Sequence, residues 1–259
     1  MPTFEFAGSQ VSYRTQGNRE DPLLLVLPGN TASSVYHKEE LAFFHSLGFR
    51  AIAIDFPGTG QSDRLPRPWP VDWFERNATA CVALLDYCGA KEAIVCGTSG
   101  GAIVALWMAI LFPERVKAVI ADSEAIRFTA ANFRELVADR TQRHDGQIQF
   151  WSGAHGTDWQ EVVDADTELF LTIEKERTKD GVWEIHNGRL GEIRCPVLFT
   201  CAINDNLVPG IGPQMLEMAA QVVDSYYFAS HQGSHPLMWS SAQLFQSVVR
   251  TFLSNIHPV

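Results

Sequence analysis

The stretch Gly97-Thr98-Ser99-Gly100-Gly101 places a serine where it could act as a nucleophile. An apolar run rich in Ile and Val leads into it from Ala93, and a second apolar run leaves it and continues to Pro113. The first run predicts a buried strand, and the second, apolar on all faces, predicts a buried helix. A Gly-x-Ser-x-Gly motif occurs by chance in many loops. Between a strand and a helix, however, it is typical of a strained turn that exposes the serine hydroxyl.

A serine hydroxyl attacks only when a base takes its proton, and the usual base is a histidine oriented by a carboxylate. In an open parallel sheet such groups gather at the carboxyl ends of the strands. Two predicted strands late in the chain end near Cys201 and Phe228. Asp205 follows the first of them, and His231 and His235 follow the second. The chain therefore offers the order serine, acid, histidine.

Alternatives to two of these residues stay open. The turn formers just before His235 favour it over His231 as the base. Asp122 or Glu124, at the end of an earlier predicted strand, could supply the acid in place of Asp205. The other histidines are expected on the surface or in the inserted segment described below, and these are His37, His45, His144, His155, His186 and His257. None has a trusted metal-ligand spacing, and no nucleotide-binding phosphate loop is present, so no metal and no cofactor are expected.

The elements that would position these residues alternate along the chain after an N-terminal hairpin within residues 3–14. Strands are predicted at 23–27, 50–54, before the serine motif and at 116–121, with helices between them. This alternation predicts a parallel sheet with helices on both faces. Residues 127–190 break the rhythm with helical patterns at 130–143 and 158–175, and the alternation resumes near 196. We therefore expect a core of 1–126 and 191–259, with a helical cap of 127–190 over the carboxyl ends of the strands.

Three tryptophans are candidates for the wall of a substrate pocket. Trp151 and Trp159 flank segment 152–156, whose glycines predict an irregular stretch that can dip toward the serine. Trp239 lies four residues past His235. Binding sites commonly use aromatic walls with few polar groups. The competing interpretation is that these aromatics only pin the cap to the core.

Composition restricts the class of protein. The 259 residues, 46% of them hydrophobic, suit one large α/β domain with an insertion. The net charge of −10 argues against nucleic acid and anionic membrane as partners. No signal peptide and no apolar run of ~20 residues is apparent, so a cytoplasmic protein without a membrane span is expected. Five cysteines without a Cys-x-x-Cys pair are expected to be buried free thiols. No oligomeric state is predicted.

Across essentially its whole length the chain resembles the α/β-hydrolase superfamily, and in particular its small capped serine hydrolases of the carboxylesterase and lactonase kind. Four motifs carry the resemblance: Gly97-Thr98-Ser99-Gly100-Gly101, Leu27-Pro28-Gly29-Asn30, Asp55-Phe56-Pro57-Gly58-Thr59-Gly60-Gln61-Ser62-Asp63, and Asp205 followed by Gly233-Ser234-His235. The resemblance implies the α/β-hydrolase fold, a mostly parallel eight-stranded sheet with helices on both faces and a helical cap insertion.

Carried over residue by residue, the resemblance implies that Ser99 is the nucleophile, His235 the general base and acid, and Asp205 the orienting carboxylate. It implies an oxyanion hole formed by the backbone N–H groups of Gly100 and Asn30. The chain departs from many relatives in one place, because Pro28-Gly29 stands where they have His-Gly. Since the donor is a backbone group, the hole can survive this change, but its aim depends on how the loop packs.

The expected activity is cofactor-independent hydrolysis of small to medium carboxylic esters or lactones through an acyl-enzyme on Ser99. The expected partner is a small-molecule ester or related acyl substrate. Relatives use the same triad for carbon–carbon bond hydrolysis, for aminopeptidase activity or for perhydrolase and haloperoxidase chemistry. A ligand-binding receptor on the hydrolase scaffold is the alternative outside catalysis.

Overall fold

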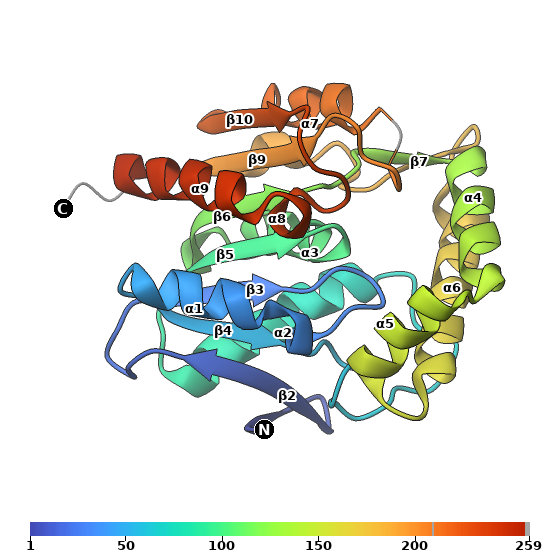
Figure 1. The fold of residues 1–259 in the computed structure, drawn as a ribbon, viewed down its shortest axis with the longest axis horizontal. Coiled ribbons are helices and arrows are strands. Elements are labelled where there is room, and N and C mark those ends of the chain that lie inside the picture. Colours follow the sequence, from blue (N-terminus) through green and yellow to red (C-terminus); the bar gives the residue numbers. More distant parts are fainter. Residues whose placement is uncertain (209, 257–259) are drawn as a thin grey trace.

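A computed structural model describes residues 1–208 and 210–256 of the chain. Its centre is an eight-stranded sheet of order β1-β2-β4-β3-β5-β6-β9-β10 (Figure 1). The strands are β1 (Thr3–Phe6), β2 (Ser9–Gln16), β3 (Leu23–Leu27), β4 (Arg50–Ile54), β5 (Ala93–Thr98), β6 (Val116–Asp122), β9 (Val197–Ala202) and β10 (Ser225–Ser230). β2 pairs antiparallel with β1 and β4, and all other neighbours are parallel. The predicted mostly parallel eight-stranded sheet is confirmed.

Helices cover both faces of the sheet, because the central strands are apolar on both sides. One face packs against α1 and α9, and the other packs against α2, α3 and α7. The bounds of these helices are α1 (Lys38–Ser46), α2 (Trp73–Cys88), α3 (Gly100–Leu111), α7 (Ile211–Ala219) and α9 (Ala242–Ile256), with the short α8 (Leu237–Ser240) before α9. Three 3-10 turns, η1 (Ser34–His37), η2 (Pro113–Arg115) and η3 (Leu190–Glu192), complete the connections.

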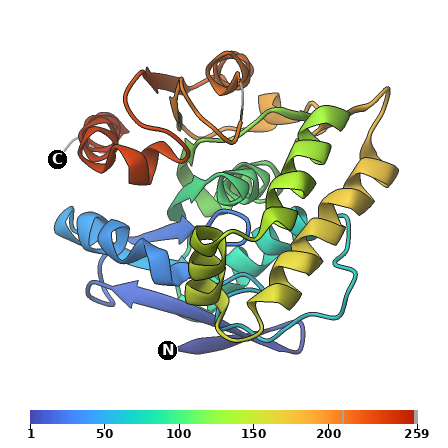
Figure 2. The same cartoon turned by 45° about the vertical axis from the view of Figure 1, so that its right-hand side comes forward.

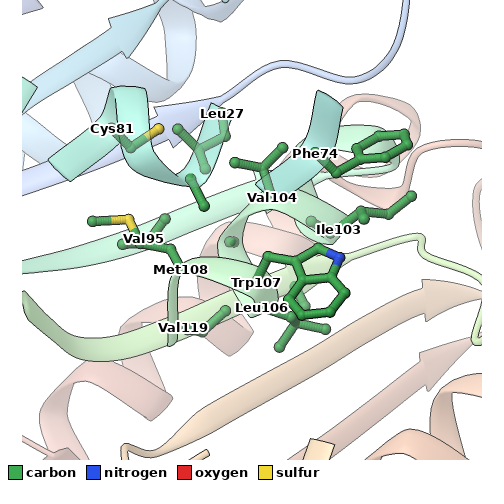
Figure 3. Close-up of a cluster of buried hydrophobic side chains, with 14 of the residues drawn as sticks. Leu27, Phe74, Cys81, Val95, Ile103, Val104, Leu106, Trp107, Met108 and Val119 are labelled. Carbon is green, nitrogen blue, oxygen red and sulfur yellow. The ribbon is translucent and has the colours of Figure 1, made fainter. Parts of the chain in front are cut away.

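The helix that follows the serine motif lies at the centre of the larger hydrophobic core. Val104 and Met108 of α3 pack among side chains from α2 and from the strands, including Cys81, Leu27 and Val95 (Figure 3). Every residue of α3 except its last is buried. This burial explains why the sequence of α3 is apolar on all faces, and it gives the preceding turn a rigid support.

Between β6 and β9 the chain carries an inserted segment that includes residues 127–190, and buried side chains of this segment join the larger hydrophobic core. The segment contains α4 (Ala130–Gln142), α5 (Asp145–His155), α6 (Trp159–Arg177) and a short antiparallel pair, β7 (Arg127–Thr129) with β8 (Val182–Glu184), which the sequence did not predict. These helices lie across the end of the sheet to which the parallel strands point (Figures 1 and 2).

One prediction for this inserted segment is wrong. Residues 152–155, expected to be irregular, continue α5 through Gly153 as far as His155. A side chain at Gly153 would collide with the hydroxyl of Tyr36, which donates to the carbonyl of Phe150 at 2.7 Å. Gly153 therefore allows α5 to pack closely against Tyr36 of the core, and it does not interrupt the helix.

The cysteines are all free. Cys81, Cys96 and Cys201 are buried as expected, whereas Cys88 and Cys195 are partly exposed. Within residues 1–208 and 210–256, no helix has the length and apolar character needed to cross a membrane.

Candidate active site

Ser99 occupies a strained turn between β5 and α3. Its φ is +52° and its ψ is −123°, a conformation that residues other than glycine rarely adopt. The turn fits because two glycines let the backbones approach closely. A Cβ on Gly97 would overlap the backbone of Gly101, and a Cβ on Gly101 would overlap the carbonyl of Leu27. Ser99 is thereby held, partly exposed, at the N-terminus of α3, where helical N–H groups have no intrahelical partner.

His235 and Asp205 meet although thirty residues separate them. Nδ1 of His235 lies 2.8 Å from Oδ2 of Asp205, and their side chains are 7% and 0% exposed. The other oxygen of Asp205 accepts from the backbone N–H groups of Leu207 and Val208, each at 2.8 Å. Because an ionised carboxylate only accepts, the proton of the neutral imidazole is on Nδ1, and Nε2 is left as an acceptor. This tautomer is the one that a general base requires.

Asp122, one of the alternative acids, is bonded elsewhere. Its buried carboxylate accepts from the hydroxyl of Thr98 at 3.1 Å, the hydroxyl of Thr200 at 2.8 Å and the backbone N–H of Met238 at 3.0 Å. Burial raises the pKa of Asp122 to about 6. Asp122 therefore ties the loop after β10, which carries His235, to the end of β5, where Ser99 follows.

The remaining alternatives also lie apart from the Asp205–His235 pair. Glu124 is fully buried, Nε2 of His186 lies 3.5 Å from its carboxyl group, and burial raises the pKa of Glu124 well above the usual range. His231 is exposed, and its carbonyl accepts from the side chain of Asn204. Among the described residues, the structure thus pairs His235 with Asp205 and with neither Asp122 nor Glu124.

The loop after β3 passes directly beside the serine turn. A Cβ on Gly29 would lie 3.2 Å from Cβ of Ser99. The next residue, Asn30, packs against Gly100: its backbone nitrogen would lie 3.0 Å from a Cβ at position 100, and its side-chain oxygen fills the space of that Cβ. The two nitrogens expected to form an oxyanion hole are therefore neighbours, with Pro28 in the place that many relatives give to histidine.

The three candidate tryptophans lie in two places. Trp151 and Trp159 are buried and stacked, with ring centroids 5.6 Å apart and an interplanar angle of 26°. Nε1 of Trp151 donates to the hydroxyl of Thr31, the residue after Asn30, at 3.1 Å. Trp239, in α8, packs instead against His37, with ring centroids 5.4 Å apart. The structure therefore brings Trp151 to the loop beside Ser99, whereas Trp239 lies beside His37 and reaches the inserted segment through Phe150 of α5, with ring centroids 6.3 Å apart.

The chain matches the family model described as the alpha/beta hydrolase fold over residues 22–148. A solved enol-lactonase from Burkholderia xenovorans superposes with a TM-score of 0.72 at 19% identity, covering 98% of this chain and all of that one. A solved hydrolase from Pseudomonas aeruginosa gives a TM-score of 0.78 at 19% identity, covering 97% of each chain. The chain has the α/β-hydrolase fold.

The curated proteins that the chain resembles differ in their reactions. The 3-oxoadipate enol-lactonase 2 of Acinetobacter baylyi is 29% identical over 137 residues, which are 51% of this chain and 50% of that protein. The 2-hydroxy-6-oxononadienedioate/2-hydroxy-6-oxononatrienedioate hydrolase of Burkholderia vietnamiensis is 23% identical and covers 94% of this chain and 91% of that one. The first match thus spans about half of each protein, and the second spans nearly all of both.

Several contacts that the sequence did not predict join the inserted segment to the core of the protein. Nδ1 of His155 accepts from the backbone N–H of Gly60 at 2.9 Å, so Nε2 carries the proton and lies 3.0 Å from the carbonyl of Thr31. Burial lowers the pKa of His155 to about 4. Arg64 donates to the carbonyl of His155 at 2.9 Å. The sequence offered one signal for this contact, the motif at 55–63, which contains Gly60 but not its partner His155.

The expectation for His37 is wrong. It lies neither on the surface nor in the inserted segment, but is fully buried in η1, with Nδ1 3.3 Å from Glu40 and its ring beside Trp239. His257 lies outside the described residues. Across 1–208 and 210–256, no group of three or more His, Cys, Asp or Glu side chains is placed to hold a metal ion.

Proposed function

We propose that this protein is a cofactor-independent serine hydrolase that cleaves small to medium carboxylic esters or lactones through an acyl-enzyme on Ser99. The observation that carries the proposal is the 2.8 Å contact between Nδ1 of His235 and Asp205. It supports a role for the imidazole as a base at the edge of the sheet where the strained Ser99 turn lies. Ser99, His235 and Asp205 are the nucleophile, the general base and the orienting carboxylate of this proposal.

In the first half-reaction, Oγ of Ser99 attacks the substrate carbonyl carbon and its proton passes to Nε2 of His235. The carbonyl oxygen becomes an oxyanion, which the backbone N–H groups of Gly100 and Asn30 stabilise. The tetrahedral intermediate then expels the alcohol oxygen, which takes the proton from His235. In a lactone this alcohol stays attached to the acyl group.

In the second half-reaction, His235 takes a proton from water, and the resulting hydroxide attacks the acyl carbon on Ser99. The second oxyanion collapses, Oγ of Ser99 recovers the proton from His235, and a carboxylic acid leaves. Each oxyanion uses the same two N–H donors, and loss of one such donor typically costs about 10²–10³ in kcat.

Two comparisons bear on the substrate, and they favour different candidate reactions. The enol-lactonase of Acinetobacter baylyi is 29% identical to about half of this chain, which favours a lactone or a related ester as the substrate. The full-length match to the 2-hydroxy-6-oxononadienedioate/2-hydroxy-6-oxononatrienedioate hydrolase favours carbon–carbon bond hydrolysis as the second candidate. Both candidate reactions use the same serine, base and acid, so only their substrates can distinguish them.

The test is a panel of p-nitrophenyl esters, lactones and vinylogous 1,5-diketones, assayed on wild type and on Ser99→Ala. We expect ester or lactone turnover in the wild type and almost none in the variant, which should stay folded because alanine is smaller than serine. A fluorophosphonate should label Ser99 and no other residue. Near-normal turnover by Ser99→Ala, or labelling elsewhere, contradicts the proposal; turnover of the diketones alone selects the second candidate.

A further inference from the structure

The side chain of Asn30 joins the loop beside Ser99 to the inserted helices. Its Nδ2 donates to Oδ1 of Asp166 at 2.6 Å, across 136 residues of sequence. Asp166 lies on α6 and is 1% exposed. A hydrogen bond to a buried carboxylate is among the stronger bonds that a neutral amide can make. Asn30, whose backbone N–H is one proposed oxyanion donor, is thus held through its side chain by α6 of the inserted segment.

Arg140 pairs with this carboxylate. Arg140 of α4 is 8% exposed and forms an ion pair with Oδ2 of Asp166. Its guanidinium lies 5.3 Å from the ring centroid of Phe170 and donates to the hydroxyl of Thr167. Two elements of the inserted segment, α4 and α6, therefore support one acceptor for Asn30. Such a buried pair contributes little net stability, but removing one partner leaves an uncompensated charge.

The carboxylate also decides how the Asn30 amide is oriented. An ionised carboxylate can only accept, so the amide must present Nδ2 to Asp166 and Oδ1 to the opposite side. That opposite side is Gly100, where Oδ1 of Asn30 fills the space in which a Cβ would lie. The amide is thus hydrogen-bonded to the inserted segment at one end and packs at the other against Gly100, the residue that carries the other proposed oxyanion donor.

We propose that Asp166 is a positioning residue that acts through Asn30. By fixing the Asn30 side chain it fixes the plane of the adjoining peptide, and so aims the backbone N–H of Asn30 at the oxyanion. This inference rests on the proposed hydrolase function. It makes the rate of the chemical steps, and not substrate binding alone, depend on α4 and α6, because a displacement of about 1 Å in a reacting group can cost 10²-fold in rate.

The test compares two double variants that both remove the ion pair and differ only in the acceptor offered to Asn30. Arg140→Met with Asp166→Leu leaves no acceptor, whereas Arg140→Met with Asp166→Asn keeps an amide oxygen. We expect the Leu variant to lose about 10–100-fold in kcat for a p-nitrophenyl ester with KM nearly unchanged. Its inhibition by a trifluoromethyl ketone, whose serine adduct carries an oxyanion, should weaken by the same factor. The Asn variant should recover most of both losses.

Asn30→Ala gives a second measurement that leaves Asp166 and Arg140 paired, so it does not depend on whether the Leu variant folds. It should show the same loss of kcat at nearly constant KM. Glu168→Gln is the matched control, because Glu168 lies on α6 as well but pairs with Arg67 at the surface, and it should leave kcat unchanged.

Equal kcat in the Leu and Asn variants, an Asn30→Ala variant with wild-type kcat, or a loss confined to KM overturns the role of Asp166. These outcomes are separable from failure of the proposed function. Fluorophosphonate labelling of Ser99 and ester turnover are measured first on the wild type, and only their absence there contradicts the hydrolase proposal itself.

Discussion

The backbone N–H of Met238 donates to the buried Oδ2 atom of Asp122 at 3.0 Å. The hydroxyl of Thr98, the residue before Ser99, donates to the same oxygen at 3.1 Å. One carboxylate thus fixes the distance between the turn that holds the serine and the loop that holds His235. Asp122 was a candidate for the orienting acid, and its bonds give it this other task instead.

Asp122→Asn should therefore lower kcat without abolishing it. Thr98, Thr200 and Met238 donate to the two oxygens of Asp122, whereas an asparagine offers only one oxygen. Its N–H group then faces a threonine hydroxyl that must turn to accept, and the hydrogen bonds to an ionised acceptor are lost, at a cost of about 1–3 kcal/mol of stability. We expect a roughly tenfold loss of kcat from the displaced loop. Urea unfolding and ester kinetics measure the two effects, with Asp224→Asn, at an exposed position before β10, as the control. Unchanged kcat in a destabilised variant would show that the contact serves stability alone.

Asp205→Asn should be far more damaging than substitution of the other acids. The amide cannot hold the His235 tautomer that accepts the proton of Ser99, and in the triad template this change costs about 10⁴ in kcat. Glu124→Gln is the matched comparison, since Glu124 is buried near His186 and does not contact His235. A larger loss of kcat in Glu124→Gln than in Asp205→Asn would show that the acid follows β6 and that our assignment is wrong.

The sequence could predict the fold and the candidates for the site because both depend on local patterns. Apolar runs separated by turns defined the parallel strands. Each candidate residue, Ser99, Asp205 and His235, follows directly after one of these runs, and parallel strands bring their carboxyl ends to one edge of the sheet.

What the sequence could not predict depends on pairs of residues far apart in the chain. Gly153 indicated a break, but its role is to admit Tyr36, which comes from another part of the fold. Asn30 and Asp166 are ordinary polar residues until they meet across 136 positions. Nothing in the local pattern at His37 shows that its ring is buried beside Trp239. Such tertiary contacts override local propensity.

His155 should make the stability of the protein sensitive to acid. Its pKa is lowered from 6.5 to about 4 in the folded state, because burial opposes the charged form of the imidazole. Between these two values the unfolded chain binds the proton and the folded chain does not. The free energy of unfolding therefore falls as the pH falls through this window, by about 2 kcal/mol for His155 between pH 7 and 5.

Other buried groups also titrate in this range, so the measurement must be a difference. The lowered pKa of His186 acts in the same direction, whereas the raised pKa values of Asp122 and Glu124 act in the opposite one. Urea unfolding at pH 7 and pH 5 should show a smaller loss of stability in His155→Gln than in wild type. His231→Gln, at an exposed position, should match the wild type. Equal pH dependence in all three proteins would contradict the role of His155.

Trp151 is the tryptophan best placed to influence substrate choice. Its ring is 4% exposed and stacked on Trp159, and its Nε1 donates to Thr31, one residue past Asn30. Trp151→Ala opens space beside the proposed oxyanion loop. We expect it to change the ranking of ester chain lengths by about 1–3 kcal/mol in kcat/KM, the range for a few methylenes in an apolar pocket. Turnover of an acetyl ester, which has the shortest acyl chain of the series, should change much less.

Two further variants test whether Trp151 lines the substrate pocket or only packs the inserted segment against the core. Trp151→Phe keeps a ring against Trp159 but removes the bond to Thr31, so it should preserve stability better than alanine while it still shifts chain-length preference. Trp183→Phe, in the aromatic cluster with Phe74, alters a buried ring away from this loop and should leave the ranking unchanged. If Trp151→Ala and Trp151→Phe slow every ester by the same factor, Trp151 serves only to dock the inserted segment, and the acyl group is bound elsewhere.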